Sequence, residues 1–530
     1  MAASTSSESL LWGTAIRYKD YHIQEKELDD MRMKIDNLAD DCFLALHENG
    51  ISVDSFILNL METPTSSYTD LRIRAFAESV LLKPAWLDYE QVKQGQQVFL
   101  KHYASAALGL LYSSLIGGFA APKIVKVLDA TAYMTKNKDA TWRRLNETME
   151  MVVDCIDTDD SLLIGNRGFN SVLKVRFLHS RVRLNILGTM RRPNNHGNSK
   201  LDGTSEEGMG SCPFHQGFIA SSKVFDDKDD EDKTDVESAE CTRSDSTNSV
   251  GGHASPDKDK EMKPTNLTLK TPVAVLNVPD MNGSKCPAQL ESKSRNDRKW
   301  DSEYYGQPIN QEDMAVTLLS FSVNVLETIE RTTLKGSLTR PDQEAYIHLW
   351  RYIGYLIGVH EDLNPCSNLE RAGGFMESAI IHLLHPDQRS VELARHLLHS
   401  VADRPPLYFS YGMHSETARS ILGKELADGL GIERNVIGSI YAYLMLKATT
   451  LISLYSLPRL TPGSARIERV RRILRLQVNK TVIALKLLEQ KKAARAVSYS
   501  STATFTGFLF VVIVVVLTLI SRSINNASRA

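Results

Sequence analysis

The chain has 530 residues, of which 42% are hydrophobic, and a formal net charge of -2. This length and composition suffice for one large domain or two ordinary ones. The near-neutral charge gives no general attraction to nucleic acid, so no nucleic-acid partner is expected. The six cysteines contain no Cys-x-x-Cys pair, which argues against a zinc ribbon or a disulfide scaffold and favours a reducing compartment.

The N-terminal part of the chain, residues 1–90, is predicted to be a helical segment. Residues 1–20 lack the basic start and apolar core of a secretory signal. A long and mostly apolar helix is predicted over 95–117. Because Lys101 and His102 interrupt it, this helix belongs in a protein core and not in a membrane.

A short helix over 123–134 precedes an amphipathic helix over 141–156. On the second helix Arg144, Glu147 and Thr148 stand at positions i, i+3 and i+4, so they share one face. They are candidate catalytic residues. A solvated face that carries an Arg–Glu ion pair is the alternative explanation of the same pattern.

The predicted helix over 171–187 has a histidine in its apolar stripe. The stripe consists of Val172, Val175, His179, Val182 and Ile186. Arg176 and Arg183 lie near the same face, three residues before His179 and four after it. An imidazole among aliphatic side chains suits an axial haem ligand, with the arginines placed to meet the propionates. On this helix alone, a buried histidine bonded to a backbone carbonyl is favoured, because a lone histidine is weak evidence.

The composition changes over 191–299, where Asp, Ser, Lys, Gly and Asn dominate. Few of these residues can build a core, so a long disordered insertion is predicted. Beyond Trp300, a helix is predicted to begin at Asn310, with Asp313 completing its cap, and to run to about Thr332. Further helices are predicted over 339–359, 387–401, 415–430, 434–456 and 466–496. No alternating strand pattern occurs, so the predicted class is all-α.

The end of the chain is predicted to be a membrane anchor. No charged residue occurs between Arg495 and Arg522, and 505–520 is almost wholly apolar. A transmembrane helix over 502–520 would have about the 20 residues that a bilayer requires. Basic residues precede it, which places the body of the protein on the cytoplasmic side; a buried terminal helix is the alternative. Arginines of the preceding helix fit either anionic headgroups or plain solvation: Arg469, Arg471, Arg472 and Arg475.

Familiar catalytic motifs are absent from the sequence, which has no GxGxxG after a strand, no Walker loop, no HExxH and no GxSxG. His382 and His385 lack a paired carboxylate at ligand spacing, and His348 and His360 are interpreted as structural. The candidate prosthetic group therefore depends on His179.

Several segments occur in a shared order: 95–122, 143–148, 175–183, 306–311 and 350–359. Together they resemble the family that joins the bacterial latex-clearing (rubber) oxygenases and the fungal ER-bound oxygenases of the MpaB type. The resemblance implies an all-α catalytic domain built around haem b. This domain is expected over 91–190 and 300–490, on either side of the insertion.

The resemblance also implies roles for individual residues. His179, in an Arg-x-x-His pattern, is similar to the proximal haem ligand, and Arg176 to the arginine beside it. Arg144 and Thr148 are similar to the polar residues over the distal face, which would hydrogen-bond a charged iron–oxygen species. The rubber-cleaving members have a lysine where this chain has Glu147. A lysine amine can occupy the sixth coordination site, whereas Glu147 is expected to pair with Arg144 or to accept a proton, so the distal geometry is expected to differ.

The implied activity is that of a membrane-anchored, haem-dependent oxygenase. It would use dioxygen to oxidise or cleave a double bond in a lipophilic, isoprenoid-like substrate. The expected location is the endoplasmic reticulum membrane, with the catalytic domain in the cytoplasm. Two alternatives stay open: a haem peroxidase or hydroxylase, and a non-catalytic helical scaffold that binds partners through its insertion. Glu147, in place of the lysine, is the observation that favours the scaffold.

Overall fold

The computed structural model describes most of the chain. The described residues are 8–12, 14–17, 21–131, 134, 137–189, 300–404, 408–455 and 463–490. Contacts divide the chain into one unit formed by 1–198 with 299–530 and a second formed by 199–298; every described residue belongs to the first unit. The insertion predicted over 191–299 and the membrane anchor predicted over 502–520 lie outside the described residues.

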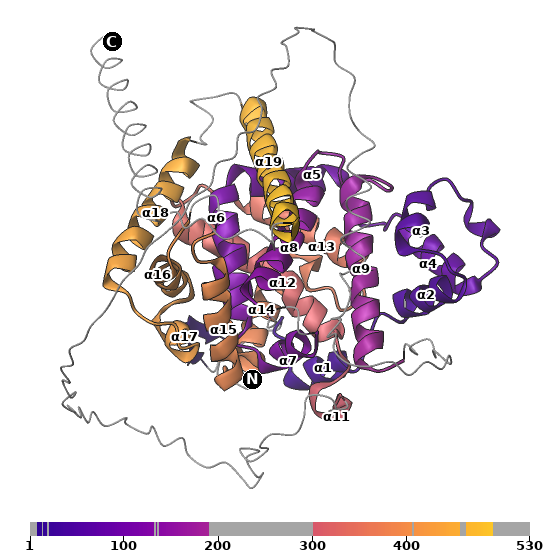
Figure 1. The fold of residues 1–530 in the computed structure, drawn as a ribbon, viewed down its shortest axis with the longest axis horizontal. Coiled ribbons are helices and arrows are strands. Elements are labelled where there is room, and N and C mark those ends of the chain that lie inside the picture. The colour runs from indigo at the N-terminus through magenta and orange to yellow at the C-terminus, as the bar shows by residue number, and fades with distance from the viewer. Residues whose placement is uncertain are drawn as a thin grey trace, which may run out of the picture. The chain divides into compact units, whose positions relative to one another are not determined.

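The described elements are almost entirely helical (Figure 1). Up to residue 189 they are β1 (Glu8–Leu11), β2 (Thr14–Arg17), α1 (Glu25–Arg32), α2 (Asn37–Glu48), α3 (Val53–Asn59), η1 (Thr65–Ser67), α4 (Leu71–Leu81), α5 (Tyr89–Lys101), α6 (Tyr103–Leu108), the π-helix η2 (Gly109–Ile116), α7 (Pro122–Thr131), α8 (Lys138–Ile156) and α9 (Arg167–Ile186). From residue 300 they are α11 (Ser302–Tyr305), α12 (Gln311–Thr332), α13 (Arg340–Ile357), η3 (Pro365–Ser367), α14 (Leu369–Leu383), α15 (Gln388–Val401), α16 (Tyr411–Leu422), α17 (Lys424–Gly429), α18 (Val436–Tyr455) and α19 (Gly463–Gln490). Within these described helices, none combines the length and the apolar character that crossing a bilayer requires.

A short antiparallel hairpin departs from the predicted all-helical pattern. In it β1 pairs with β2, and Glu8 stands opposite Arg17. Strands of four residues are too short for an alternating pattern to stand out from neighbouring helical sequence. Apart from this hairpin, the described residues confirm the all-α class.

The core is built around α12 and α13, which pack against each other and against helices from the N-terminal half of the chain. α12 contacts α6 and η2, while α13 contacts α5 and α9. Gly95 allows the closest of these approaches, because a Cβ there would lie 2.5 Å from the carbonyl oxygen of Ala345. Side chains such as Leu319 and Ile329 of α12 are completely buried. The apolar stripes of the long helices thus face one shared core.

Helix starts follow local capping signals. Asn310 with Asp313 and Thr339 with Asp342 form the capping boxes that begin α12 and α13. Asp387 caps α15 in the same way. In each box a side-chain oxygen accepts from a free backbone N–H of the first turn, so the signal is local and readable in the sequence.

Two predicted helices are interrupted. The helix predicted over 95–117 breaks at His102 and continues as α6 and then the π-helix η2. Within η2 the Ser114 hydroxyl donates to the carbonyl oxygen of Gly109 at 3.0 Å, five residues earlier, and so satisfies a carbonyl inside the widened turn. The helix predicted over 415–430 divides at Gly423, whose φ of +87° ends α16.

Candidate functional site

The candidate site lies on α8 and α9, which pack against each other. Gly168 permits this packing at the start of α9, because a Cβ there would lie 2.7 Å from the carbonyl oxygen of Asp154 on α8. The Ser171 hydroxyl then donates to the Asp154 carboxylate at 2.9 Å. The two helices that carry the predicted site residues are therefore fixed to each other at one end.

The predicted stripe of α9 lies on the side of the helix that the protein covers least. Its half-buried members include Val175, His179, Val182 and Ile186, and only Val172 among the predicted stripe is buried. The opposite side of the helix is buried: Leu173, Phe177, Ser180, Arg183 and Leu184. An aliphatic face that its own chain leaves half-covered fits contact with a bound apolar group.

His179 is the polar centre of this face. Its Nδ1 atom is buried and has no hydrogen-bond partner among the described residues. Burial, together with the positive charges of Arg183 and Arg144, lowers the pKa of His179 to about 3. The imidazole is therefore neutral at physiological pH and retains the lone pair that metal ligation requires. The alternative from the sequence, a buried histidine bonded to a backbone carbonyl, does not describe this Nδ1 atom.

Across from this face, α8 carries the predicted distal residues. Nη1 of Arg144 lies 3.3 Å from Oε2 of Glu147, so the two form the expected ion pair. The Thr148 hydroxyl donates to the backbone oxygen of Arg144 at 3.1 Å. Arg144 is near enough to His179 for its charge to lower the histidine pKa.

Every residue of α8 from 142 to 150 is half-buried, whichever side of the helix it occupies, whereas 151–156 are buried. A helix between a filled core and water shows buried and exposed sides in alternation. The side chains of this half of α8 are therefore neither sealed in the core nor fully exposed to water. The Arg144, Glu147 and Thr148 face lies in this half.

Sequence reasoning missed one acidic residue here. Burial raises the pKa of Glu150 to about 7, and the negative charge of Asp154 adds to the effect. Glu150 lies one helical turn beyond Glu147. A carboxyl group with a pKa near 7 exchanges a proton readily at neutral pH. The signal in the sequence was the spacing of Glu150 and Asp154 at i and i+4, which places like charges side by side.

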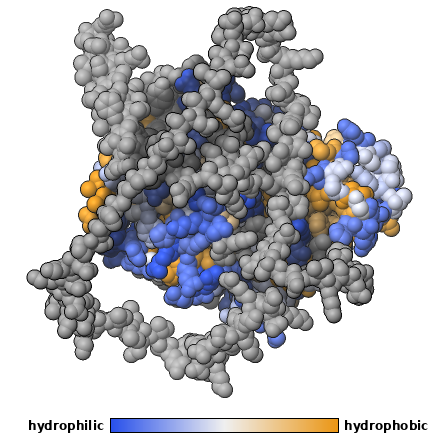
Figure 2. Space-filling view, in the orientation of Figure 1, coloured by the Kyte–Doolittle hydropathy of each residue, from blue (hydrophilic) through white to orange (hydrophobic). Residues whose placement is uncertain are grey.

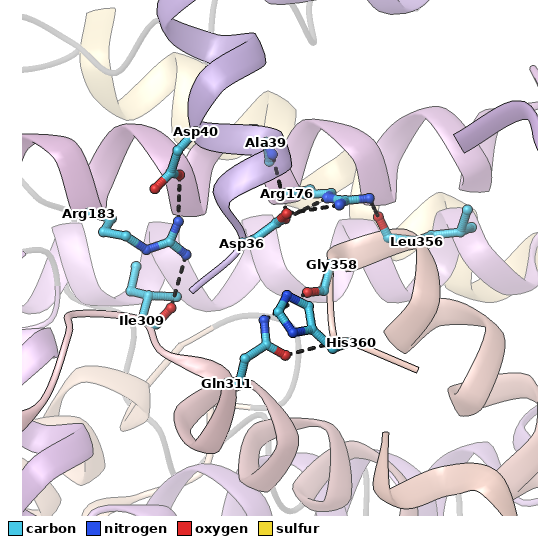
Figure 3. Close-up of polar contacts among 10 residues, drawn as sticks. All are labelled: Asp36, Ala39, Asp40, Arg176, Arg183, Ile309, Gln311, Leu356, Gly358 and His360. Atoms are coloured by element: carbon cyan, nitrogen blue, oxygen red, sulfur yellow. Dashed lines mark hydrogen bonds and ion pairs between the residues drawn. The ribbon is translucent and has the colours of Figure 1, made fainter. Parts of the chain in front are cut away.

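The two arginines predicted to flank His179 are used inside the fold (Figure 3). Arg176 donates to both carboxylate oxygens of Asp36, at 2.6 and 2.9 Å. Arg183 donates to the Asp40 carboxylate at 2.5 Å and to the carbonyl oxygen of Ile309 at 2.9 Å. Both side chains are buried, so these bonds join α9 to α2 and to the segment before α12. A contact with propionates, which stays a prediction, would require some of these bonds to be exchanged.

Figure 3 also shows how the segments beside these ion pairs are held. The Gln311 side chain donates to the carbonyl oxygen of Gly358 at 3.1 Å and accepts from the backbone N–H of His360 at 2.9 Å. Gly358 has a φ of +97°, and a Cβ there would lie 2.1 Å from the Asp36 carboxylate. Burial alone would raise the pKa of Asp36, but Arg176 outweighs this effect and lowers it.

A cavity of about 460 Å³ opens between α7, α11, α12 and the turn that follows α14. Its lining includes Lys123, Lys126, Asp129, Glu312, His382 and Arg389. Charged groups of both signs make this cavity suitable for a polar group and unsuitable for a hydrocarbon chain. No cluster of His, Cys, Asp or Glu that would hold a metal ion occurs among the described residues. That finding concerns multi-ligand sites, whereas a haem iron takes a single axial side chain from its proximal side.

Part of the chain matches a family of known proteins. Residues 289–447 match the model of "ER-bound oxygenase mpaB/B'/Rubber oxygenase, catalytic domain". No curated protein matches the chain. A solved structure of latex clearing protein in the closed state is similar at 15% identity, covering 88% of this chain and 93% of that chain with a TM-score of 0.45. This structural likeness is too distant to support an argument about the site, and the matched residues do not include α8 or α9.

Proposed function

We propose that this chain is a haem-dependent oxygenase in which His179 holds haem b; the match of residues 289–447 to the MpaB/rubber oxygenase catalytic-domain model supports the oxygenase class. Its substrate would be a lipophilic, isoprenoid-like molecule with a double bond, and its co-substrate dioxygen. The observation that carries the proposal is the buried, unpartnered Nδ1 atom of His179 on a half-covered aliphatic face.

The residues around His179 fit haem in three respects. The imidazole is held neutral, which ligation requires. Aliphatic side chains at 175, 182 and 186 lie beside it on the same face and would contact the macrocycle. Residues 142–150 of the packed helix α8 are half-buried, so a bound group could contact them. Bound haem would supply an iron centre that activates dioxygen, chemistry that amino-acid side chains do not supply.

The residues of α8 would then handle charge and protons. Arg144, held by Glu147, presents a guanidinium in a partly water-free site, where it would stabilise negative charge that develops on oxygen. Glu150 would take up or release a proton near pH 7. The Thr148 hydroxyl, whose hydrogen is committed to the backbone oxygen of Arg144, keeps lone pairs that accept from a donor on the substrate.

The first test is the absorbance spectrum of the full chain with a pyridine haemochrome assay. We expect a Soret band and close to stoichiometric haem b, which His179→Ala abolishes. His382→Ala removes a histidine from the polar cavity and is expected to retain the haem. A His179→Ala protein that keeps its haem would refute the ligand assignment.

Product analysis separates the remaining possibilities. Oxygen uptake with a prenylated substrate, followed by identification of the products, distinguishes cleavage of the double bond from hydroxylation or peroxidase chemistry. A folded protein that stays colourless when haem is supplied would favour the helical scaffold, for which the Arg144–Glu147 pair is simply a solvated ion pair.

The membrane location is a further part of the proposal. The apolar run 505–520 and the words "ER-bound" in the family description support a single-pass anchor in the endoplasmic reticulum with the helical unit in the cytoplasm. Two of the arginines predicted to meet headgroups have another use, because Arg471 pairs with Asp159 and Arg475 with Asp154 and Asp157.

A further inference from the structure

The helix α18 (Val436–Tyr455) carries its large apolar side chains on its outer side. The side that packs against α6, α12 and α16 is buried and consists mainly of small or flexible residues: Gly438, Ala442, Met445 and Thr449. The outer side forms what we call the α18 stripe: Val436, Ile437, Ile440, Tyr443, Leu444 and Leu451, exposed by 82, 68, 60, 60, 37 and 46%. Lys447 is the single charged residue of this helix.

The helix is fixed in place with this stripe outward. At its start, Gly438 lies so close to α16 that a Cβ would be 2.2 Å from the carbonyl oxygen of Gly412. Towards its end, the Thr450 hydroxyl donates to the carbonyl oxygen of Thr332 on α12 at 2.8 Å. Rotation of α18 to bury the stripe would break both contacts. Figure 2 shows apolar residues at the left edge of the molecule, where Figure 1 places α18.

An ordinary surface helix has its large apolar side chains facing the core and polar ones facing water, whereas α18 has its large apolar side chains facing outward. A helix that is apolar on all sides is normally surrounded by protein or by lipid. A contiguous apolar surface on a folded protein marks a place where something binds. The side chains of the α18 stripe are therefore expected to have an occupant.

Two protein occupants fit poorly. A second copy of this chain would meet a single helical ridge about 22 Å long, whereas stable interfaces use roughly 20–30 residues on each side. The chain's own run over 505–520 is apolar on every side. If it lay on α18, its outer side would remain in water. A bilayer accommodates both the run and the stripe.

The polar residues of the outer side also indicate lipid. Nζ of Lys447 lies 5.3 Å from the centroid of the Tyr443 ring. Tyr and Lys are the residue types whose apolar stems enter a membrane while their polar ends stay at headgroup level. Lys447 further gives the face a positive charge that complements anionic headgroups.

From these observations we propose that α18 lies in the interfacial layer of a lipid bilayer, with its stripe inserted among the lipids and with Tyr443 and Lys447 at headgroup level. Such helices enter to a depth of about 5–10 Å and do not cross the membrane. The proposal is independent of haem binding and of the oxygenase activity. It adds a second membrane contact to the anchor predicted at the C-terminus.

The test is photocrosslinking of the full chain in vesicles of phosphatidylcholine and phosphatidylserine. A benzophenone amino acid replaces Ile440, and the same residue replaces Leu71 as a control, because Leu71 on α4 is 70% exposed and belongs to no stripe. We expect phospholipid adducts on the peptide that contains position 440 and none at position 71. Crosslinks from 440 to a C-terminal peptide, crosslinks to a second copy, or no adduct at all would each overturn the proposal.

A paired substitution provides the second measurement. With the probe at 440, Ile437→Glu with Leu444→Glu is expected to reduce the lipid adduct at least about tenfold, because carboxylates are expelled from the apolar layer. The matched control is Leu71→Glu with Leu82→Glu, two residues that are 70 and 66% exposed, and it should leave the adduct unchanged. Leu444, at 37%, is the least exposed of the replaced side chains and none of them is buried, so thermal melting is expected to confirm an intact fold. An undiminished adduct in the stripe variant would contradict insertion.

Discussion

Burial shifts two titratable groups of the α8–α9 pair in opposite directions. It lowers the pKa of His179 to about 3 and raises that of Glu150 to about 7. In both cases removal from water disfavours the charged form. The histidine is therefore ready to donate a lone pair at neutral pH, while the carboxyl group exchanges a proton there. A carboxyl group that titrates near neutral pH and a candidate metal ligand thus lie on packed helices.

The pKa of Glu150 predicts a stability that depends on pH. Its folded-state pKa lies above the ordinary value of 4.5, so the folded protein binds more protons than the unfolded chain between about pH 4.5 and 7. Stability contributed by this group is present below that window and is lost as the pH rises through it. Glu150→Gln should remove this loss and raise the free energy of unfolding at pH 8 by about 1–2 kcal/mol, a value discounted for partial exposure.

Denaturant unfolding at pH 5 and pH 8 measures this effect. Glu90→Gln serves as the control, because the Glu90 side chain is 83% exposed. Equal pH dependence in the Glu150→Gln variant and the unsubstituted protein would show that Glu150 titrates normally.

The partners of Arg176 and Arg183 could not be predicted from the sequence. Their partners, Asp36 and Asp40, lie on or next to α2, well over a hundred residues earlier in the chain. The spacing on α9 placed both arginines near His179, but nothing local indicates which carboxylates they meet. In the structure both arginines bind these aspartates, and a contact with propionates stays a prediction.

At the scale of elements, the helix starts were predictable and the interruptions were not. Asn310, Thr339 and Asp387 mark the starts of α12, α13 and α15 because capping uses residues within one turn. After the break at His102, α6 and the π-helix η2 pack against α12, a tertiary contact that sequence periodicity does not contain. The α8–α9 pair was predictable as two helices, yet the half-burial of 142–150 required the fold.

At Gly358 the turn that ends α13 comes close to Asp36, which caps the start of α2. Gly358→Ala would place a Cβ 2.1 Å from the Asp36 carboxylate at a φ of +97°. We expect a loss of about 3 kcal/mol, since strain at positive φ adds to disruption of the buried Arg176–Asp36 pair.

Gly336 is a matched control for this substitution. It has a φ of +82°, and a Cβ there would meet nothing within 4 Å. Gly336→Ala should therefore cost only about 1 kcal/mol, the strain alone. Chemical denaturation measures both variants, and equal losses would mean that the contact with Asp36 is unimportant.

At the scale of the whole molecule, ion pairs join the C-terminal helix to the N-terminal half. Nη1 of Arg475 on α19 lies 2.8 Å from the Asp154 carboxylate, and Nη2 lies 2.6 Å from that of Asp157. Arg471 donates to the carbonyl oxygen of Ile156 at 3.2 Å. The family resemblance pointed to a domain divided by an insertion, but only the fold shows that its last helix closes against α8.

Arg475→Met tests this closure. Asp154 is 1% exposed and, among the described residues, would keep Arg167 as its one basic partner, so we expect a loss of about 1–2 kcal/mol and faster hydrogen exchange in α19. Arg472→Met, at an exposed position on the same helix, should change neither quantity. Hydrogen-exchange mass spectrometry distinguishes the two variants. Unchanged exchange in Arg475→Met would show that the Arg475 ion pairs do not hold α19 against α8.

The attachment of α19 has a mechanical consequence. The ion pairs of Arg475 hold α19 against the end of α8. The last residue of the helix, Gln490, lies about 22 Å beyond Arg475 along the helix axis. The end of α19 at Gln490 is therefore held in position relative to α8. These ion pairs thus set the direction of α19 relative to the α8–α9 pair, and their loss would displace Gln490 more than any residue nearer to Arg475.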